Sequence, residues 1–204
     1  MITIIDYKAG NLKSVERALL HLGVHCRITH DPQEIMSAER VIFPGVGAAG
    51  QAMDTIRSTG LDKAIHVVVN RGTPFMGICL GTQIILEESE EDAITPCLGI
   101  IPGKVRRFSA SGLKIPHMGW NHIAVRFDHP LLDEVDSQAQ FYFVHSFYPD
   151  PRNAADIVAT TEYGITFASI LARKNVFATQ FHPEKSGRQG LKILENFSCW
   201  DGLV

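Results

Sequence analysis

The chain lacks the features that would direct it to a membrane, a secretory route or a nucleic-acid complex. It contains no run of about 20 apolar residues, the length a helix needs to cross a bilayer. Met1 is followed directly by Ile2-Thr3-Ile4-Ile5, without the charged segment, long apolar stretch and cleavage site of a signal peptide. The net charge of -3 gives no positive excess that would attract nucleic acid or an anionic membrane. We therefore expect a cytoplasmic protein that binds neither.

Cysteine is scarce and widely spaced. The four cysteines are Cys26, Cys79, Cys97 and Cys199, and no C-x-x-C pair occurs. This spacing disfavours a zinc site or a thioredoxin-like motif, so we expect no metal site. In a reducing cytosol each cysteine would by default be a free, inert thiol. Cys79 stands in a different context.

The first half of the chain alternates strand and helix patterns. The length of 204 residues suits one domain with a substantial core, residues 1–204. Short apolar runs indicate strands, and apolar residues at helical spacing indicate helices between them. We expect strands at 2–7, 24–29, 41–43 and 74–79, and helices near 12–22, from Asp31, at 48–58 and at 61–70. This alternation predicts an α/β fold with a mostly parallel central sheet flanked by helices.

The second half is rich in strands and poor in helices. We expect strands at 104–108, 121–126, 140–148, 156–161 and 166–180, and one helix near 191–198. Without intervening helices these strands are expected to be antiparallel additions to the central sheet.

Cys79 lies in the motif Gly77-Ile78-Cys79-Leu80-Gly81, between an apolar strand and a helix pattern. A G-x-C-x-G motif in this context predicts a nucleophile elbow, in which a sharp turn exposes the side chain. The helix N-terminus would favour a thiolate, and the backbone N–H of Leu80 would face a developing oxyanion. The alternative is a buried structural cysteine whose glycines serve only the turn.

A second motif, Gln180-Phe181-His182-Pro183-Glu184, follows a strand near the C-terminus. Glu184 can fold back and hold one imidazole nitrogen of His182, leaving the other free to exchange a proton with Cys79. This is the arrangement of nucleophile, base and orienting group. Among the nine histidines only His145, within Phe143-Val144-His145-Ser146-Phe147, has a comparable context at a strand end.

The two motifs, roughly 100 residues apart, resemble those of the triad (class I) glutamine amidotransferases, whose flavodoxin-like fold would cover the chain. The resemblance implies that Cys79 is the nucleophile, His182 the general base and acid, and Glu184 its orienter, with no cofactor. It implies that Leu80 and Val46 are backbone oxyanion donors. It also implies that six residues bind L-glutamine: Gly47, Gln83, Glu91, His145, Ser146 and Phe147. Glu91 could instead belong to a solvated acidic face, because Glu87, Glu88 and Glu90 are its neighbours.

Within that family, the segments 115–121 and 182–187 resemble the glutaminase subunits of imidazole glycerol phosphate synthases of histidine biosynthesis, and Pro44-Gly45-Val46-Gly47 replaces the glycine-pair loop typical of many other relatives. That resemblance implies a heterodimer with a (β/α)8-barrel cyclase subunit that consumes the ammonia. Its implied interface consists of Pro116, His117, Met118, Trp120 and Lys185. Thr82 departs from the subfamily, in which methionine is commoner, and we interpret it as a polar turn residue.

The glycines around Val46 predict a mobile loop. We expect the Val46 N–H to point away from the site when the protein is resting and to turn inward when the partner is docked. Gly45, Gly47 and Gly50 have the spacing of a dinucleotide-binding motif. The acidic residue that should bind the ribose about 20 residues later is missing, so the sequence disfavours nucleotide binding.

Three other functions remain open from the sequence. The chain could supply ammonia to a different synthase, it could be a thiol hydrolase or peptidase on a flavodoxin-like sheet, or it could be an inactive binding subunit. The Gln83 and His145–Phe147 elements favour a pocket for free glutamine over a peptidase cleft, and the intact Cys79, His182 and Glu184 disfavour an inactive subunit.

Overall fold

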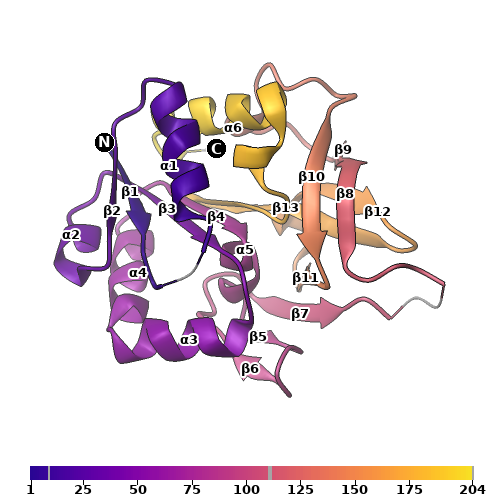
Figure 1. Ribbon diagram of the computed structural model, residues 1–204, viewed down its shortest axis with the longest axis horizontal. Coiled ribbons are helices and arrows are strands. Elements are labelled where there is room, and N and C mark those ends of the chain that lie inside the picture. Colours follow the sequence, from indigo (N-terminus) through magenta and orange to yellow (C-terminus); the bar gives the residue numbers. More distant parts are fainter. Residues whose placement is uncertain (9, 110–111, 204) are drawn as a thin grey trace.

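The computed structural model describes residues 1–8, 10–109 and 112–203. They fold around an eight-stranded sheet with the strand order β2-β1-β3-β4-β14-β13-β12-β9 (Figure 1). The five strands from β2 to β14 in this order are parallel, and the last three are antiparallel additions. The parallel strands are β1 (Ile2–Ile5), β2 (Cys26–Thr29), β3 (Arg40–Gly45), β4 (Phe75–Cys79) and β14 (Val176–Thr179). The antiparallel strands are β13 (Thr166–Arg173), β12 (Ile157–Glu162) and β9 (Ala124–Val125).

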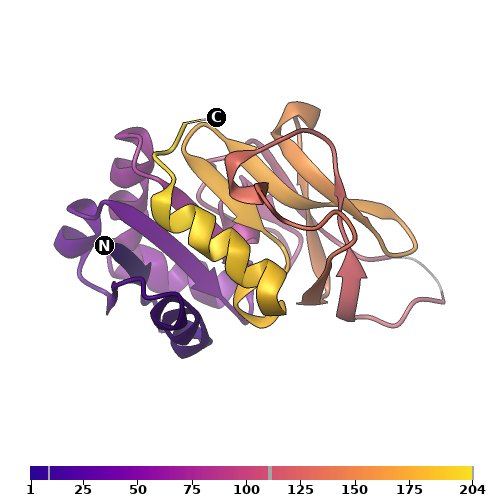
Figure 2. The same cartoon turned by 90° about the horizontal axis from the view of Figure 1, so that it is seen from above.

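Helices cover both faces of the parallel strands. Helices α1 (Leu12–His21) and α6 (Gly187–Cys199) lie on one face, and α3 (Ala49–Ser58) and α4 (Leu61–Asn70) on the other (Figures 1 and 2). The short helix α2 (Pro32–Met36) packs against α4. Because successive side chains point to opposite faces, Ile42 joins the core under α1 and α6, whereas Val41 and Phe43 join the core under α3 and α4. The apolar runs without polar alternation are thereby explained.

Two smaller sheets stand beside the main one. Strand β10 (Gln140–His145) pairs with β8 (His117–His122), and a four-stranded sheet has the order β11-β7-β5-β6. Its strands are β11 (Phe147–Pro151), β7 (Gly103–Arg107), β5 (Glu88–Ser89) and β6 (Thr95–Pro96). The remaining elements are α5 (Leu80–Ile84) and the 3-10 turns η1 (Pro130–Leu132), η2 (Ala154–Asp156) and η3 (Pro183–Lys185).

The predicted α/β fold with a mostly parallel sheet and added antiparallel strands is confirmed, but three predicted strand ranges each divide into two strands. The range 166–180 is a hairpin, β13 and β14, that turns at Lys174 with a positive φ of 53°. The range 140–148 is divided at Ser146 between two sheets. The range 121–126 contains the end of β8 and the separate strand β9.

The parallel strand order reverses direction between β1 and β3. In open α/β sheets, ligands bind at the carboxyl ends of the strands beside such a reversal. The carboxyl ends of β3, β4 and β14 carry Gly45, Cys79 and Thr179, so both sequence motifs converge on this edge.

None of the described helices has the length and apolar character needed to span a membrane. In the ranges that the structure describes, no cluster of three or more His, Cys, Asp or Glu side chains could hold a metal ion.

Candidate active site

Cys79 occupies the turn between β4 and α5, as the elbow motif predicts. It is the last residue of β4, its φ is 54° and its ψ is −105°, and α5 begins at the next residue. A positive φ in a residue with a side chain costs on the order of 1–3 kcal/mol and persists only where the surroundings enforce it. Gly81 helps to hold this turn in place, because its lack of a side chain lets α5 lie close to β3. A Cβ there would lie 1.9 Å from the carbonyl oxygen of Phe43 on β3. Helix α5 thus packs directly against the neighbouring strand.

Thr82 anchors the same helix on its other side. Its side chain is fully buried, and its hydroxyl donates a hydrogen bond of 2.6 Å to the carbonyl oxygen of Thr179 on β14. The interpretation of Thr82 as a turn residue therefore needs correction: it ties the helix after Cys79 to the strand that leads to His182.

His182 and Glu184 form a buried pair beside Cys79. The Nδ1 atom of His182 lies 2.8 Å from Oε1 of Glu184, and both side chains are fully buried. The other ring nitrogen, Nε2, is buried and makes no hydrogen bond within the described residues. Because Nδ1 is occupied by the carboxylate, Nε2 is the nitrogen free to exchange a proton with the thiol.

Asn11 completes this arrangement and was not identified from the sequence. At the start of α1, its side-chain amide donates to Oε1 of Glu184 at 2.6 Å and lies 3.4 Å from Nδ1 of His182. The only local signal was a polar residue preceding a helix, which commonly indicates a cap. Asn11 makes no side-chain cap hydrogen bond to α1 and contacts Glu184 instead.

The charges in this cluster stabilise one another. Burial lowers the pKa of His182, but attraction to the Cys79 thiolate and the hydrogen bond to Glu184 outweigh burial and raise it above its ordinary value. Burial raises the pKa of Glu184, whereas the hydrogen bonds from His182 and Asn11 hold it below its usual range. The geometry therefore favours an imidazolium at His182 paired with a carboxylate at Glu184.

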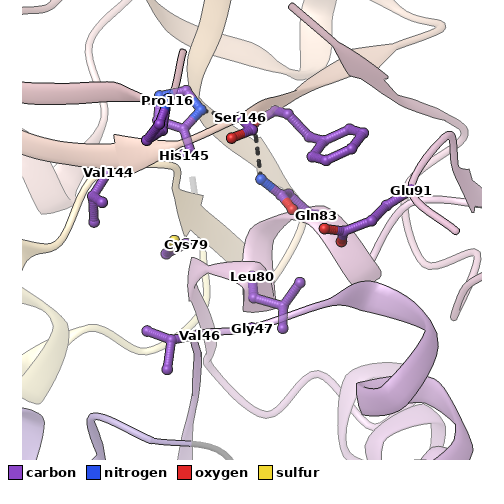
Figure 3. A pocket seen from close by; sticks show the side chains of 11 residues that line it. Val46, Gly47, Cys79, Leu80, Gln83, Glu91, Pro116, Val144, His145 and Ser146 are labelled. Carbon is purple, nitrogen blue, oxygen red and sulfur yellow. Dashed lines mark hydrogen bonds between the residues drawn. The ribbon is translucent and has the colours of Figure 1, made fainter.

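A pocket of about 360 Å³ opens over Cys79. Figure 3 shows Cys79 between Val46 and Leu80 on one side and His145 and Val144 on the other. The lining contains both predicted oxyanion residues and all six predicted glutamine-binding residues, and also Pro116. A space of this size suits a small molecule rather than a folded chain.

Glu91 differs from the acidic residues around it. Its carboxylate accepts a hydrogen bond of 2.7 Å from the backbone N–H of Ala49 at the start of α3, and it lines the pocket. Burial is the main cause that raises its pKa. Its neighbours form surface ion pairs: Glu87 with Arg152, Glu88 with Lys104, and Glu90 with Arg106.

His145 forms a buried pair with His117. The distance from Nε2 of His145 to Nδ1 of His117 is 3.0 Å, and Nδ1 of His145 donates to the carbonyl oxygen of Phe147 at 2.7 Å. Burial lowers the pKa of His145 to about 3 and that of His117 to about 4, so both rings are neutral at pH 7.

The five residues expected at the partner interface differ in exposure. Met118 and Trp120 project from β8 with 60% and 54% of their surface exposed, and Lys185 is exposed too. Trp120 is therefore not a core residue. Pro116 is half-buried in the pocket wall, and His117 is buried against His145.

Gln180 is a second residue near Cys79 that the sequence analysis quoted but left without a function. It is fully buried, and its amide nitrogen lies 3.8 Å from the Cys79 sulfur. Its position two residues before His182 was the available signal.

Comparison with known proteins gives consistent results. The family model described as "Glutamine amidotransferase class-I" matches residues 3–199. The chain is 54% identical to "Imidazole glycerol phosphate synthase subunit HisH" of Desulfovibrio desulfuricans, over 97% of this chain and 93% of that protein. It is 46% identical to the protein of the same name in Pseudomonas syringae pv. syringae, over 98% of each.

Two solved structures share the fold at low identity. One, described as "Crystal structure of glutamine amidotransferase", has a TM-score of 0.73 and 20% identity over 97% of this chain and 99% of that one. The other, described as "Structure of PurLQS from Thermotoga maritima", has a TM-score of 0.72 and 17% identity over 96% of each chain.

Proposed function

The chain belongs to the class-I glutamine amidotransferases, and from this membership and the site geometry we propose that Cys79, His182 and Glu184 release ammonia from L-glutamine. The chain is an enzyme, the glutaminase subunit of an imidazole glycerol phosphate synthase, as are relatives about 50% identical over nearly its whole length. The observation that carries the proposed site is the His182–Glu184 pair. It leaves Nε2 of His182 buried, without a hydrogen bond among the described residues, beside a cysteine held at positive φ.

The reaction is an acyl transfer in two stages. The Cys79 thiolate attacks the side-chain amide carbon of glutamine, and the developing oxyanion accepts hydrogen bonds from the backbone N–H groups of Leu80 and Val46. His182 protonates the departing ammonia. It then takes a proton from water, which hydrolyses the γ-glutamyl thioester, releases glutamate and returns the thiolate.

The substrate lies in the pocket over Cys79. Glu91 and Gln83, with the segment His145–Phe147 and Gly47, hold the amino-acid end of glutamine so that its amide reaches the sulfur. The partly desolvated carboxylate of Glu91 suits the substrate ammonium, because opposite charges attract more strongly away from water. No cofactor takes part in these steps.

Val46 is the residue through which we propose that docking of the partner controls the rate of glutamine hydrolysis. Losing one oxyanion donor typically lowers a rate on the order of 10²–10³-fold. We place the Val46 N–H away from the site when the protein is resting and turned inward when the partner is docked. Gly47, at a φ of 108°, gives the chain beside Val46 a conformation that other residues rarely adopt. A structure of the active complex with this N–H still turned away would contradict the mechanism.

The ammonia passes to a cyclase subunit. We propose that this partner is a (β/α)8 barrel, that the two chains form a heterodimer, and that the cyclase makes imidazole glycerol phosphate and AICAR in histidine biosynthesis. The proposed interface is Pro116, His117, Met118, Trp120 and Lys185; large exposed apolar residues such as Met118 and Trp120 are enriched in interface cores. His117 contributes from beneath, through its buried contact with His145. A cytoplasmic location, where Cys79 stays reduced, belongs to the same proposal.

The test is glutamate release from glutamine, with and without the cyclase and its nucleotide ligand. Wild type should be strongly stimulated by the loaded partner, and Cys79→Ala should have no activity in any condition. Activity that is indifferent to this partner would point to a different synthase. Activity that survives in Cys79→Ala would overturn the nucleophile.

A further inference from the structure

A buried amide side chain that does not line the pocket approaches the sulfur of Cys79. Gln180 has no exposed surface, and its Nε2 lies 3.8 Å from the Cys79 Sγ, within hydrogen-bonding range for sulfur. Gln180 is not among the residues that line the pocket, so it touches the nucleophile without contacting the space proposed for glutamine. Gln180 can therefore act on the reaction through the sulfur, and through the hydrogen bond that its oxygen accepts from Gln83, which does line the pocket.

The orientation of this amide is fixed by its neighbours. The backbone carbonyl of Phe147 can only accept, so the group 2.9 Å away must be the nitrogen of Gln83, as Figure 3 draws it. The same nitrogen lies 3.1 Å from the Gln180 amide and donates to its oxygen. The nitrogen of Gln180 is then the atom that faces Cys79.

A second chain of hydrogen bonds fixes the Phe147 carbonyl itself. Because His145 donates to that carbonyl through Nδ1, its Nε2 must accept from Nδ1 of His117. The Nε2 of His117 then accepts from the side-chain amide of Asn121 at 3.3 Å. While the rings of His117 and His145 are both neutral, each hydrogen bond in this series can run in only one direction.

We propose that Gln180 is a positioning residue that donates a directional hydrogen bond to the Cys79 thiolate. The orientation of its amide is set by Gln83, whose nitrogen donates both to the Phe147 carbonyl and to the oxygen of Gln180. This deepens the proposed function and depends on it only in taking Cys79 as the nucleophile. A hydrogen bond to the charged form of a group favours that form. Gln180 therefore stabilises the sulfur whenever it is an anion, before attack and again when the thioester is broken.

The test compares Gln180→Met, which removes both hydrogen-bonding atoms, with Gln180→Glu, which keeps an acceptor for Gln83. The measurement is the rate of Cys79 alkylation by iodoacetamide across pH, quantified by peptide mass spectrometry without glutamine. Because the thiolate is the reactive form, both variants should react about tenfold more slowly at pH 7, with the midpoint of the pH profile moved upward. In the glutaminase assay with the partner, kcat should fall about tenfold in both variants, and KM should stay near the wild-type value in Gln180→Glu, which keeps the contact with Gln83.

Ser169→Ala is the matched control. Its hydroxyl is buried and unpaired within the described residues, and its backbone carbonyl bonds the Gln180 N–H, so the change removes a neighbouring polar group without touching Cys79. It should leave the alkylation profile unchanged. Wild-type profiles in both Gln180 variants, folded as judged by circular dichroism, would overturn the proposal, as would a loss of kcat without any change in alkylation. If wild type released no glutamate with any partner, the proposed function would fail while the alkylation profiles still reported on the donor.

Discussion

Cys79, at the scale of single residues, combines a left-handed φ of 54° with a position between a strand and a helix. We predict that Cys79→Gly is more stable than Cys79→Ala by about 1 kcal/mol, because glycine adopts this backbone without strain. Both variants lack the sulfur, so the comparison separates strain from chemistry. Urea denaturation at pH 7 measures the difference. Equal stability would show that the turn is not strained.

The buried carboxylate of Glu184 should govern the rate through His182. Glu184→Gln keeps the shape but removes the charge that orients and stabilises the imidazolium, so kcat should fall roughly 10²- to 10⁴-fold, the range of general acid–base catalysis. Asn11→Ala removes only one donor to that carboxylate and should cost about tenfold. Steady-state glutaminase kinetics check both. A larger loss in Asn11→Ala than in Glu184→Gln would reverse the proposed order of importance.

Sequence reasoning at this scale could reach the candidate residues whose determinants are local. Cys79 was recognisable from its flanking glycines, and Glu184 lies two residues from His182. Asn11 could not be found in this way, because its partner Glu184 is 173 residues away. For Gln180, only the fold shows that its amide is turned to Cys79, since the intervening contact with Gln83 spans 97 residues.

Among the elements, α5 depends most directly on glycine. In Gly81→Ala the new Cβ would lie 1.9 Å from the Phe43 carbonyl oxygen, so β3 and α5 must separate. We predict a loss of about 3 kcal/mol in unfolding free energy and a loss of activity, because Cys79 and Leu80 would move with the helix. Gly60→Ala is the control: its φ is 74°, but among the described residues only its own chain neighbours come within 4 Å of the new Cβ. It should cost about 1 kcal/mol and leave activity intact.

The element boundaries show where sequence patterns cease to be informative. The parallel strands were predictable because burial on both faces makes them continuously apolar, as in β3. In the range 140–148, aromatic and apolar residues lie on both sides of Ser146, and no glycine or proline marks it as the point where the chain passes from β10 to β11. The start of strand β8 was missed because its exposed face carries Met118 and Trp120. Large apolar residues on the exposed face hide the alternation of polar and apolar residues that marks a half-buried strand.

For the whole molecule, three buried neutral histidines should make stability depend on pH. Burial lowers the pKa of His117 and His129 to about 4 and that of His145 to about 3. Below about pH 6.5 the unfolded chain therefore binds more protons than the folded one, and stability falls with pH. Each histidine should cost up to about 2 kcal/mol between pH 6.5 and 5. The raised pKa values of Glu91 and Asp156 act in the opposite direction and should offset part of this loss.

Urea denaturation at pH 7, 6 and 5 measures this dependence. His129→Asn is a suitable comparison, because asparagine can still accept the hydrogen bond that His129 receives from the Leu131 N–H but does not titrate. The variant should lose stability less steeply than wild type. Stability that rose as the pH fell from 6.5 to 5 would contradict the assignment of neutral, buried rings.

The exposed residues of β8 lead to the prediction about assembly. Trp120→Ala should weaken binding of the cyclase at least tenfold, since large aromatic residues dominate interface energies. Val67→Ala is the control, because Val67 is also exposed, at 45%, but lies on α4. Isothermal titration calorimetry with the purified partner measures both. Equal effects would remove β8 from the interface.

The two ends of the main sheet have a consequence for aggregation. The sheet ends in β2, four residues long, at one side and in β9, two residues long, at the other. Unpaired backbone at a sheet edge is a template on which further chains can add as strands, and short edges offer few such groups. The main sheet thus presents little backbone for amyloid-like stacking, beside a β8 strand whose Met118 and Trp120 are exposed.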